Sequence, residues 1–301
     1  MQMNNYVTYH LHTEVSLLDS CTNHKLYTDK AVELGQTAIA FTEHGNIFNW
    51  VEKKMYCDEM GIKYIHGIEV YLTEKIDEEE KVRDNYHTIL LAKNYEGVKE
   101  INRLFTLSHS ESHFYYKPRI TFDEFLDISD NVIKTSACLQ SPLRYLYRDG
   151  SDMSAERRAV FLKVAKHYDY LEIQHHDIED QKDYNKFLYA LSKKIGTPLI
   201  AGTDTHNLDK YKAECREMLQ YGKEAIFSKE SDSEDSINME YMTYDELVDA
   251  YKKQDCLPMD VVLEAINNTN VMADSVEEFE LDKSFKYPYL YGKDDKKVLL
   301  D

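Results

Sequence analysis

Hydrophobic and polar residues follow two different periods along the first two thirds of the chain. Short apolar runs predict strands at residues 6–10, 37–41, 62–72, 87–92, 132–138, 170–174 and 199–202. Stretches with helical spacing predict helices at residues 25–34, 47–60, 95–107, 155–167 and 179–194, with a short helix after Thr121. Strands that alternate with helices favour an α/β fold with a parallel sheet and right-handed crossovers, either as a closed barrel or as an open sheet.

Three segments interrupt this pattern. The strand at 62–72 is expected to break at 66–67, and the acidic residues 74–85 predict a solvated loop. Residues 109–119 show no period, so we expect an inserted loop near the mouth of a pocket.

The pattern changes beyond about residue 208. Helical segments follow one another around an acidic linker at 229–235, and the last residues have the composition of an extended chain. We therefore expect a barrel over 1–228, a helical appendage over 229–285, and a linker over 286–301 that leads toward a further domain.

Composition limits the classes of function. The 301 residues can form one barrel-sized domain, and 43% hydrophobic with 30% charged residues is typical of a globular protein. A net charge of −19 argues against a free-standing nucleic-acid binder, because affinity for phosphate is built from Lys and Arg. Nucleic acid could still bind at one cationic metal site.

The sequence contains no apolar run of membrane-spanning length and no secretory signal, so we expect a cytoplasmic protein without a membrane partner. Its five cysteines are scattered and form no Cys-x-x-Cys pair. This usage fits a reducing compartment with free thiols, one of which could be a metal ligand.

Residues that commonly bind metals collect at the ends of the predicted strands. His10 and His12 project from the same side of an extended segment and place two imidazoles at one spot. The other candidates at strand ends or in the loops beside them are Asp19, His44, Glu69, His87, Cys138, Asp204 and His206. The carboxyl ends of parallel strands converge on one face, so we expect all nine side chains to lie together.

Nine ligands exceed what one tetrahedral ion can use, so two or three ions are implied, with Glu69 as a natural bridge. Imidazoles with one thiolate suit zinc, and manganese or iron are alternatives where carboxylates dominate. Ions roughly 3.5–4 Å apart clamp a phosphate and lower the pKa of bound water toward about 7. This chemistry fits phosphoester hydrolysis without a Ser, Cys or Lys nucleophile.

The motifs that carry these residues resemble the PHP (polymerase and histidinol phosphatase) family. They lie at residues 10–12 (HLH), 17–19 (LLD), 42–46 (TEHGN), 67–71 (GIEVY), 87–94 (HTILLAKN), 117–120 (KPRI), 136–139 (SACL) and 202–206 (GTDTH). As an ordered set they are most similar to the N-terminal PHP domains of bacterial DNA polymerase III alpha subunits, over nearly the whole chain.

The resemblance implies a distorted (βα)7 TIM-like barrel with three divalent ions. Its metal sites would be His10, His12, Glu69 and Asp204; Asp19, His44 and His206; and Glu69, His87 and Cys138. His10, His12, Glu69, His87, Asp204 and His206 would act in catalysis through the metals. One departure is Glu43, where the family commonly has Asp; its effect on the neighbouring ligand is left open.

PHP domains that keep the full ligand set resemble metal-dependent 3′–5′ exonucleases, whereas some polymerase PHP domains have lost ligands and are structural. All nine ligands are present here. We therefore expect a phosphodiesterase that acts on the 3′ end of single-stranded DNA, with the remainder of a replicative polymerase as partner. The alternatives are a structural module that docks other parts of the polymerase, and a small-molecule phosphatase of the histidinol-phosphate type.

Several residues outside the ligand set have two interpretations. Arg119 could bind a substrate phosphate or hold its loop by a salt bridge. The aromatic segment 114–116 could stack on unpaired bases, although packing under the loop is favoured. His175 and His176 follow a strand outside the motif set, and a substrate contact is the less favoured interpretation for them.

Overall fold

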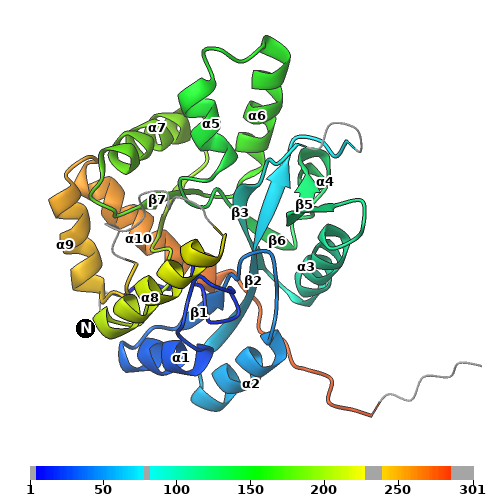
Figure 1. The fold of residues 1–301 in the computed structure, drawn as a ribbon. Coiled ribbons are helices and arrows are strands. Elements are labelled where there is room, and N and C mark those ends of the chain that lie inside the picture. The colour runs from blue at the N-terminus through cyan, green and yellow to red at the C-terminus, as the bar shows by residue number, and fades with distance from the viewer. Residues whose placement is uncertain (1–4, 78–81, 228–238, 286–301) are drawn as a thin grey trace, which may run out of the picture.

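The computed structural model describes residues 5–77, 82–227 and 239–285. Within these residues, strands form the centre of the molecule and helices lie around them (Figure 1). One sheet has the strand order β4-β5-β2-β3-β6, with β1 paired to β2, and a second sheet pairs β7 with β8. The strands are β1 (Ala38–Phe41), β2 (Lys63–Thr73), β3 (Tyr86–Ala92), β4 (Phe114–Tyr115), β5 (Lys117–Thr121), β6 (Val132–Thr135), β7 (Leu171–Gln174) and β8 (Leu199–Gly202).

The two sheets close into a ring through isolated backbone bridges. Thr135 at the end of β6 bridges Tyr170 before β7. The predicted strand at 6–10 is an extended segment whose residues make single bridges, from Thr8 to Ile39 of β1 and from Leu11 to Thr205 beyond β8. This segment therefore stands in the ring with β1, β2, β3, β6, β7 and β8, which confirms the predicted distorted, TIM-like barrel.

The expectation of a parallel sheet is wrong for β3, which runs antiparallel to both β2 and β6. Antiparallel neighbours need only a loop between them, whereas a parallel pair needs a long crossover, and the chain between Thr73 and Tyr86 contains no helix among the described residues. The reversal has a consequence for the site: Tyr71 near the end of β2 pairs with His87 at the start of β3.

The helices largely match the predicted ones. They are α1 (His24–Glu33), α2 (Trp50–Met60), α3 (Tyr95–Ser108), α4 (Phe122–Leu126), α5 (Pro142–Asp149), α6 (Ala155–His167), α7 (Glu179–Ile195), α8 (Lys210–Phe227), α9 (Tyr244–Gln254) and α10 (Met259–Asp274). Asn23 caps α1 with its side chain, and Gly61 ends α2 in the left-handed conformation. Helix α5, which Ser141 caps, was not predicted because it is short.

Three local predictions differ from the structure. Strand β2 continues through 66–67 without a break, since its neighbours β1 and β3 pair with it on both sides there. Helix α2 begins later than expected, because Asn49 adopts a left-handed conformation. The segment 109–119 contains the hairpin of β4 and β5, whose turn residue Tyr116 has a φ of 60°.

The helices after the barrel pack directly on it. In α10, the Asn268 side chain donates to the Leu199 carbonyl over 2.7 Å, and the Thr269 hydroxyl accepts from the Val7 amide over 2.9 Å. The proposed division at 228/229 stays a prediction, and the expected linkers at 229–235 and 286–301 lie outside the described residues. Every described helix is too short or too polar to cross a bilayer.

A capping box holds the start of α4, directly after β5. The Thr121 hydroxyl accepts from the Glu124 amide, and the Glu124 carboxylate accepts from the Thr121 amide. We expect Thr121→Ala to lower the free energy of unfolding by about 1 kcal/mol, as loss of a helix cap does. Urea unfolding measures this free energy. Thr106→Ala, at an exposed position inside α3, is the control and should leave the free energy of unfolding unchanged. Equal decreases in both variants would contradict the capping role.

Candidate metal centre

The N-terminal segment delivers His10 and His12 to the same end of the barrel as the loop after β8. The Thr205 amide donates to the His10 carbonyl over 3.0 Å, and the His12 amide donates to the Thr205 carbonyl over 2.9 Å. Asp204 and His206 flank that residue, so the pairing fixes all four side chains together. The Nε2 atoms of His10 and His12 lie 3.1 Å and 3.3 Å from Asp204 Oδ1.

Glu69 in β2 lies between three imidazoles. Its Oε1 is 2.9 Å from His87 Nδ1 and 3.7 Å from His10 Nε2, while its Oε2 contacts His44 Nδ1. The antiparallel register of β3 puts His87 at this position. Cys138 Sγ, in the loop after β6, lies 3.7 Å from His87 Nδ1 and joins the same group.

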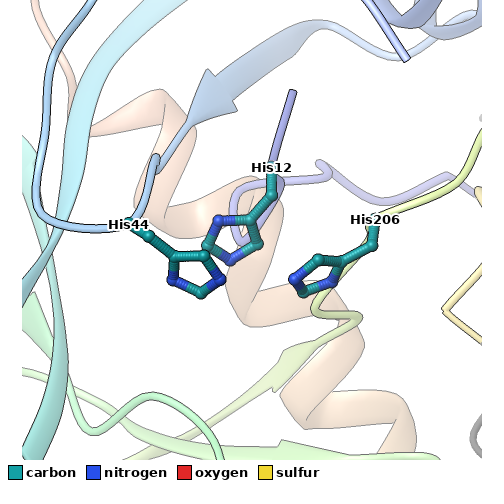
Figure 2. Close-up of side chains that lie close together, drawn as sticks. All are labelled: His12, His44 and His206. Carbon is teal, nitrogen blue, oxygen red and sulfur yellow. The ribbon is translucent and has the colours of Figure 1, made fainter. Parts of the chain in front are cut away.

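A second group contains three imidazoles from three separate loops. Figure 2 shows His12, His44 and His206 close together, with ring centroids 4.0 Å apart for His12 and His44 and 4.3 Å apart for His12 and His206. Asp19 Oδ2 lies 2.8 Å from His44 Nε2 and 3.4 Å from His206 Nε2. All nine predicted ligands therefore form one continuous cluster.

The cluster has the donor atoms that a divalent cation requires. His10 Nε2, His12 Nε2, Glu69 Oε1 and Asp204 Oδ1 are buried and have no hydrogen-bond partner within the described part of the chain. Buried polar atoms are normally hydrogen-bonded, so four such atoms in one place need another partner. Mixed imidazole and carboxylate ligands fit zinc and related divalent ions. The ligand role of the nine residues stays a prediction.

The charges in the cluster depend on one another. Burial raises the pKa of Glu69 and Asp204, but the neighbouring imidazoles outweigh burial and hold both pKa values well below their usual range. Burial, with His44 and His206 beside it, lowers the pKa of His12 to about 3, so this imidazole is neutral and can bind a cation. Burial lowers the pKa of His44, but Glu69 outweighs it and raises the value to about 10. A cation must therefore displace a proton from His44.

Glu172 in β7 supports the cluster from behind, and the sequence analysis missed it. Its Oε1 lies 2.7 Å from His10 Nδ1, and its Oε2 accepts from the Tyr9 hydroxyl over 2.8 Å. Gln174 donates to it as well. A carboxylate at Nδ1 holds the proton there and leaves Nε2 of His10 as the free ligand atom. A Cβ on Gly202 would lie 2.2 Å from Glu172 Oε1, so this approach requires glycine.

A buried ion pair holds the loop after His12. Glu43 accepts from Lys53 Nζ over 2.6 Å, from the Ser16 hydroxyl over 2.6 Å and from the Thr13 hydroxyl over 2.6 Å. Ser16 Oγ in turn lies 3.2 Å from His12 Nδ1. Glu43 therefore connects to His12 through Ser16, and the effect of Glu in place of Asp stays open. Burial raises the pKa of Glu43, but Lys53 outweighs it and lowers the value to about 2.

The remaining candidates lie around the cluster. Arg119 is buried, and its Nη1 donates to the Val82 carbonyl over 2.7 Å, so it contacts the neighbouring loop through a backbone hydrogen bond; the expected salt bridge and the substrate contact stay predictions. His175 and His176 are buried with ring centroids 4.6 Å apart. Arg216 in α8, which the sequence analysis missed, binds Asp19 Oδ1 over 2.7 Å. No motif marks it in the sequence.

Glu172→Gln tests the support of His10. An amide cannot offer two acceptor oxygens to Tyr9 and His10, so we expect metal affinity to fall about 10- to 100-fold, as is typical for loss of such a partner. Competition with a chromophoric chelator measures the affinity. Glu100→Gln is a matched control, because Glu100, in α3 and outside the cluster, accepts from the Ser129 amide. Unchanged affinity in Glu172→Gln would contradict the proposed support.

Lys53→Met tests the buried ion pair in metal-free protein. It leaves the Glu43 carboxylate buried without its cation, and we expect the free energy of unfolding to fall by about 3–5 kcal/mol at pH 7. The pKa of Glu43 is depressed, so this contribution is complete above 4.5 and is lost as the pH falls toward about 2. Urea unfolding at several pH values measures it. Glu43→Gln/Lys53→Met should recover part of the loss; a double variant no more stable than Lys53→Met would contradict the pairing.

Comparisons with known proteins show which family this chain belongs to. The PHP domain family model matches residues 8–176. The chain is 32% identical over 282 residues to the DNA polymerase III subunit alpha of Borreliella burgdorferi. The aligned region covers 92% of this chain and 24% of that protein. The chain is 31% identical over 314 residues to the same subunit of Campylobacter jejuni, which covers 99% of this chain and 26% of that protein. The chain thus spans about a quarter of the length of these relatives.

Among solved structures, a two-domain protein from Bacteroides vulgatus that contains a predicted PHP-like metal-dependent phosphoesterase matches with a TM-score of 0.44 and 11% identity. The match covers 71% of this chain and 55% of that one. The family model ends before Asp204 and His206, and the structure places these two residues against His10 and Asp19, which lie within the matched residues. The family match covers more than half of the chain, and this chain therefore belongs to the PHP family.

Proposed function

We propose that this chain is a metal-dependent phosphodiesterase that removes 3′-terminal nucleotides from DNA, as the PHP domain of a replicative DNA polymerase III alpha subunit or of a relative. The observation that supports it is the single cluster that contains all nine ligand candidates. The similarity to alpha subunits favours DNA as the substrate and the rest of a polymerase as the partner.

Three groups of residues would hold the metals, with zinc as first choice and manganese or iron as alternatives. One group is His10, His12, Glu69 and Asp204; the second is Asp19, His44 and His206; the third is Glu69, His87 and Cys138. Bound ions would supply charge neutralisation at the phosphate and hydroxide at neutral pH.

The burial of the ligands indicates how substrate would enter. His10, His12 and Glu69 are fully buried and form the floor of the cluster, whereas the side chains of Asp19, His44 and His87 are partly exposed. A phosphodiester would approach from that exposed side. Glu172, Glu43 and their hydrogen bonds keep the floor fixed while substrate binds.

The test is hydrolysis of a 5′-labelled single strand by purified protein with zinc, manganese or iron. We expect stepwise shortening from the 3′ end, which both a chelator and His12→Ala abolish. His167→Ala, in α6 and outside the cluster, should keep its activity. Metal binding and metal-dependent melting without shortening would contradict the proposal and favour a structural module. Faster turnover of a phosphomonoester than of the oligonucleotide would contradict it in favour of a small-molecule phosphatase.

A further inference from the structure

We propose that the β4–β5 hairpin beside the metal centre is a binding platform for single-stranded DNA, on which the nucleotides next to the reacting 3′ end lie. This inference rests on the proposed function, because it assigns the neighbouring part of the same substrate. The hairpin comprises β4, the turn at Tyr116 and β5.

Two aromatic rings of the hairpin face solvent. Phe114 is 49% exposed and Tyr116 is 64% exposed, so the favoured expectation that this segment packs under its loop is wrong for both. Tyr115 between them is half-buried and pairs with Lys117 in the hairpin. Exposed aromatic faces next to a catalytic site are unusual for mere packing, and they offer stacking surfaces for unpaired bases.

Positive charge accompanies these rings although the chain as a whole carries −19. The Arg83 guanidinium carbon lies 4.0 Å from the centroid of the Tyr116 ring, and Arg83 Nη2 donates to the Tyr116 hydroxyl over 2.8 Å. Lys117 is exposed at the next position. Glu74 in the same region binds Arg157. Arg83 and Lys117 thus place two cationic side chains beside the exposed rings, where a polyanion could contact them.

A single aromatic ring connects the hairpin to the metal centre. Lys117 Nζ lies 5.0 Å from the centroid of the Tyr71 ring. Tyr71 also neighbours the proposed ligands His87 and His44, with ring centroids at 5.0 Å and 6.4 Å. The Tyr71 side chain thus lies between the Lys117 ammonium and the partly exposed candidate ligands. We expect the next phosphate of a bound strand to contact this ammonium.

Tight packing fixes the hairpin relative to the ligands. A Cβ on Gly45, the residue after His44, would lie 2.7 Å from Pro118 Cγ and 2.9 Å from the Tyr71 ring. The glycine has a φ of 62°, so it provides both the turn and the close approach. The platform and the His44 loop therefore form one rigid rim rather than two independent loops.

Further rings connect the hairpin with the loop after His44. Phe48, exposed in the loop after His44, lies 6.2 Å from Phe105, which lies 4.5 Å from His109; His109 lies 6.1 Å from Phe114. A row of rings with two cations near the hairpin has no pattern of hydrogen-bond donors and acceptors that would distinguish one base from another. It fits a strand of any sequence, as stacking platforms do.

The test is binding of a fluorescent oligothymidylate by fluorescence anisotropy, with the full chain in chelator, so that no hydrolysis is needed. We expect Tyr116→Ala to raise Kd about tenfold, in the range typical for loss of one stacked base. Tyr116→Phe keeps the ring and should bind nearly as the original protein does. Lys117→Ala should make the dependence of log Kd on log salt shallower by about 0.7, as loss of one phosphate contact to a single strand does.

Tyr95 and Lys99 provide matched controls. At the start of α3, Lys99 Nζ lies 4.9 Å from the centroid of the exposed Tyr95 ring, which packs on Phe279. This tyrosine and lysine match the two residue types that are changed in the hairpin. Tyr95→Ala and Lys99→Ala should leave Kd unchanged. A small diester, bis(p-nitrophenyl) phosphate, separates the two proposals in the metal-loaded protein, since it is too small to reach the hairpin. Tyr116→Ala should hydrolyse it at the original rate.

The inference is overturned if the original protein does not bind the oligonucleotide, or if Tyr116→Ala and Lys117→Ala bind it as tightly as Tyr95→Ala does. Retained melting temperatures exclude misfolding as the cause of any loss. Failure of the proposed function gives a different result, because then neither the small diester nor the oligonucleotide is hydrolysed, whatever the hairpin variants do in the binding assay.

Discussion

The burial of the Glu69 and Asp204 carboxylates is the constraint on which the rest of the structure depends. Moving a carboxylate out of water costs several kcal/mol even after the protein relaxes, so each charge must meet a compensating group at close range. Imidazoles hold the pKa values of both carboxylates low, yet buried atoms of both carboxylates and of His10 and His12 lack hydrogen-bond partners within the described residues. A bound cation would satisfy these atoms.

Backbone contacts, rather than contacts among the candidate ligands, bring the side chains of the cluster together. The N-terminal segment is held between β1 and the loop after β8 by single bridges, so two histidines reach the centre without a regular strand. Reversal of β3 brings His87 to the same end of the barrel as Glu69. Glu172 is also buried, and its charge is met by His10, Tyr9 and Gln174. The glycine at 202 leaves the space that this carboxylate needs.

The proximity of the nine candidate ligands could be predicted because they lie at or near the ends of apolar runs, which converge at one end of the barrel. The argument from strand ends does not account for His87, which lies at the start of its strand. It reaches the cluster through the antiparallel pairing of β3 with β2, and the hydrophobic pattern of the sequence does not specify that pairing. Glu172 could not be found this way: one acidic residue in a short buried strand has the same pattern whether it binds a histidine or a lysine. The hairpin was missed because two-residue strands have no measurable period.

The chain and its proposed DNA substrate are both negatively charged, so binding would depend on the positions of a few positive charges. A chain with a net charge of −19 repels DNA at long range, and salt screens that repulsion beyond about 10 Å at moderate ionic strength. At short range the strand would meet Lys117 on the hairpin, Arg83 beside it and cations bound at the candidate ligands. Affinity then comes from stacking and from a few local charges, and not from a broad basic surface. Such a site favours a strand already delivered to it, which is the situation of a domain joined to a larger DNA-binding protein.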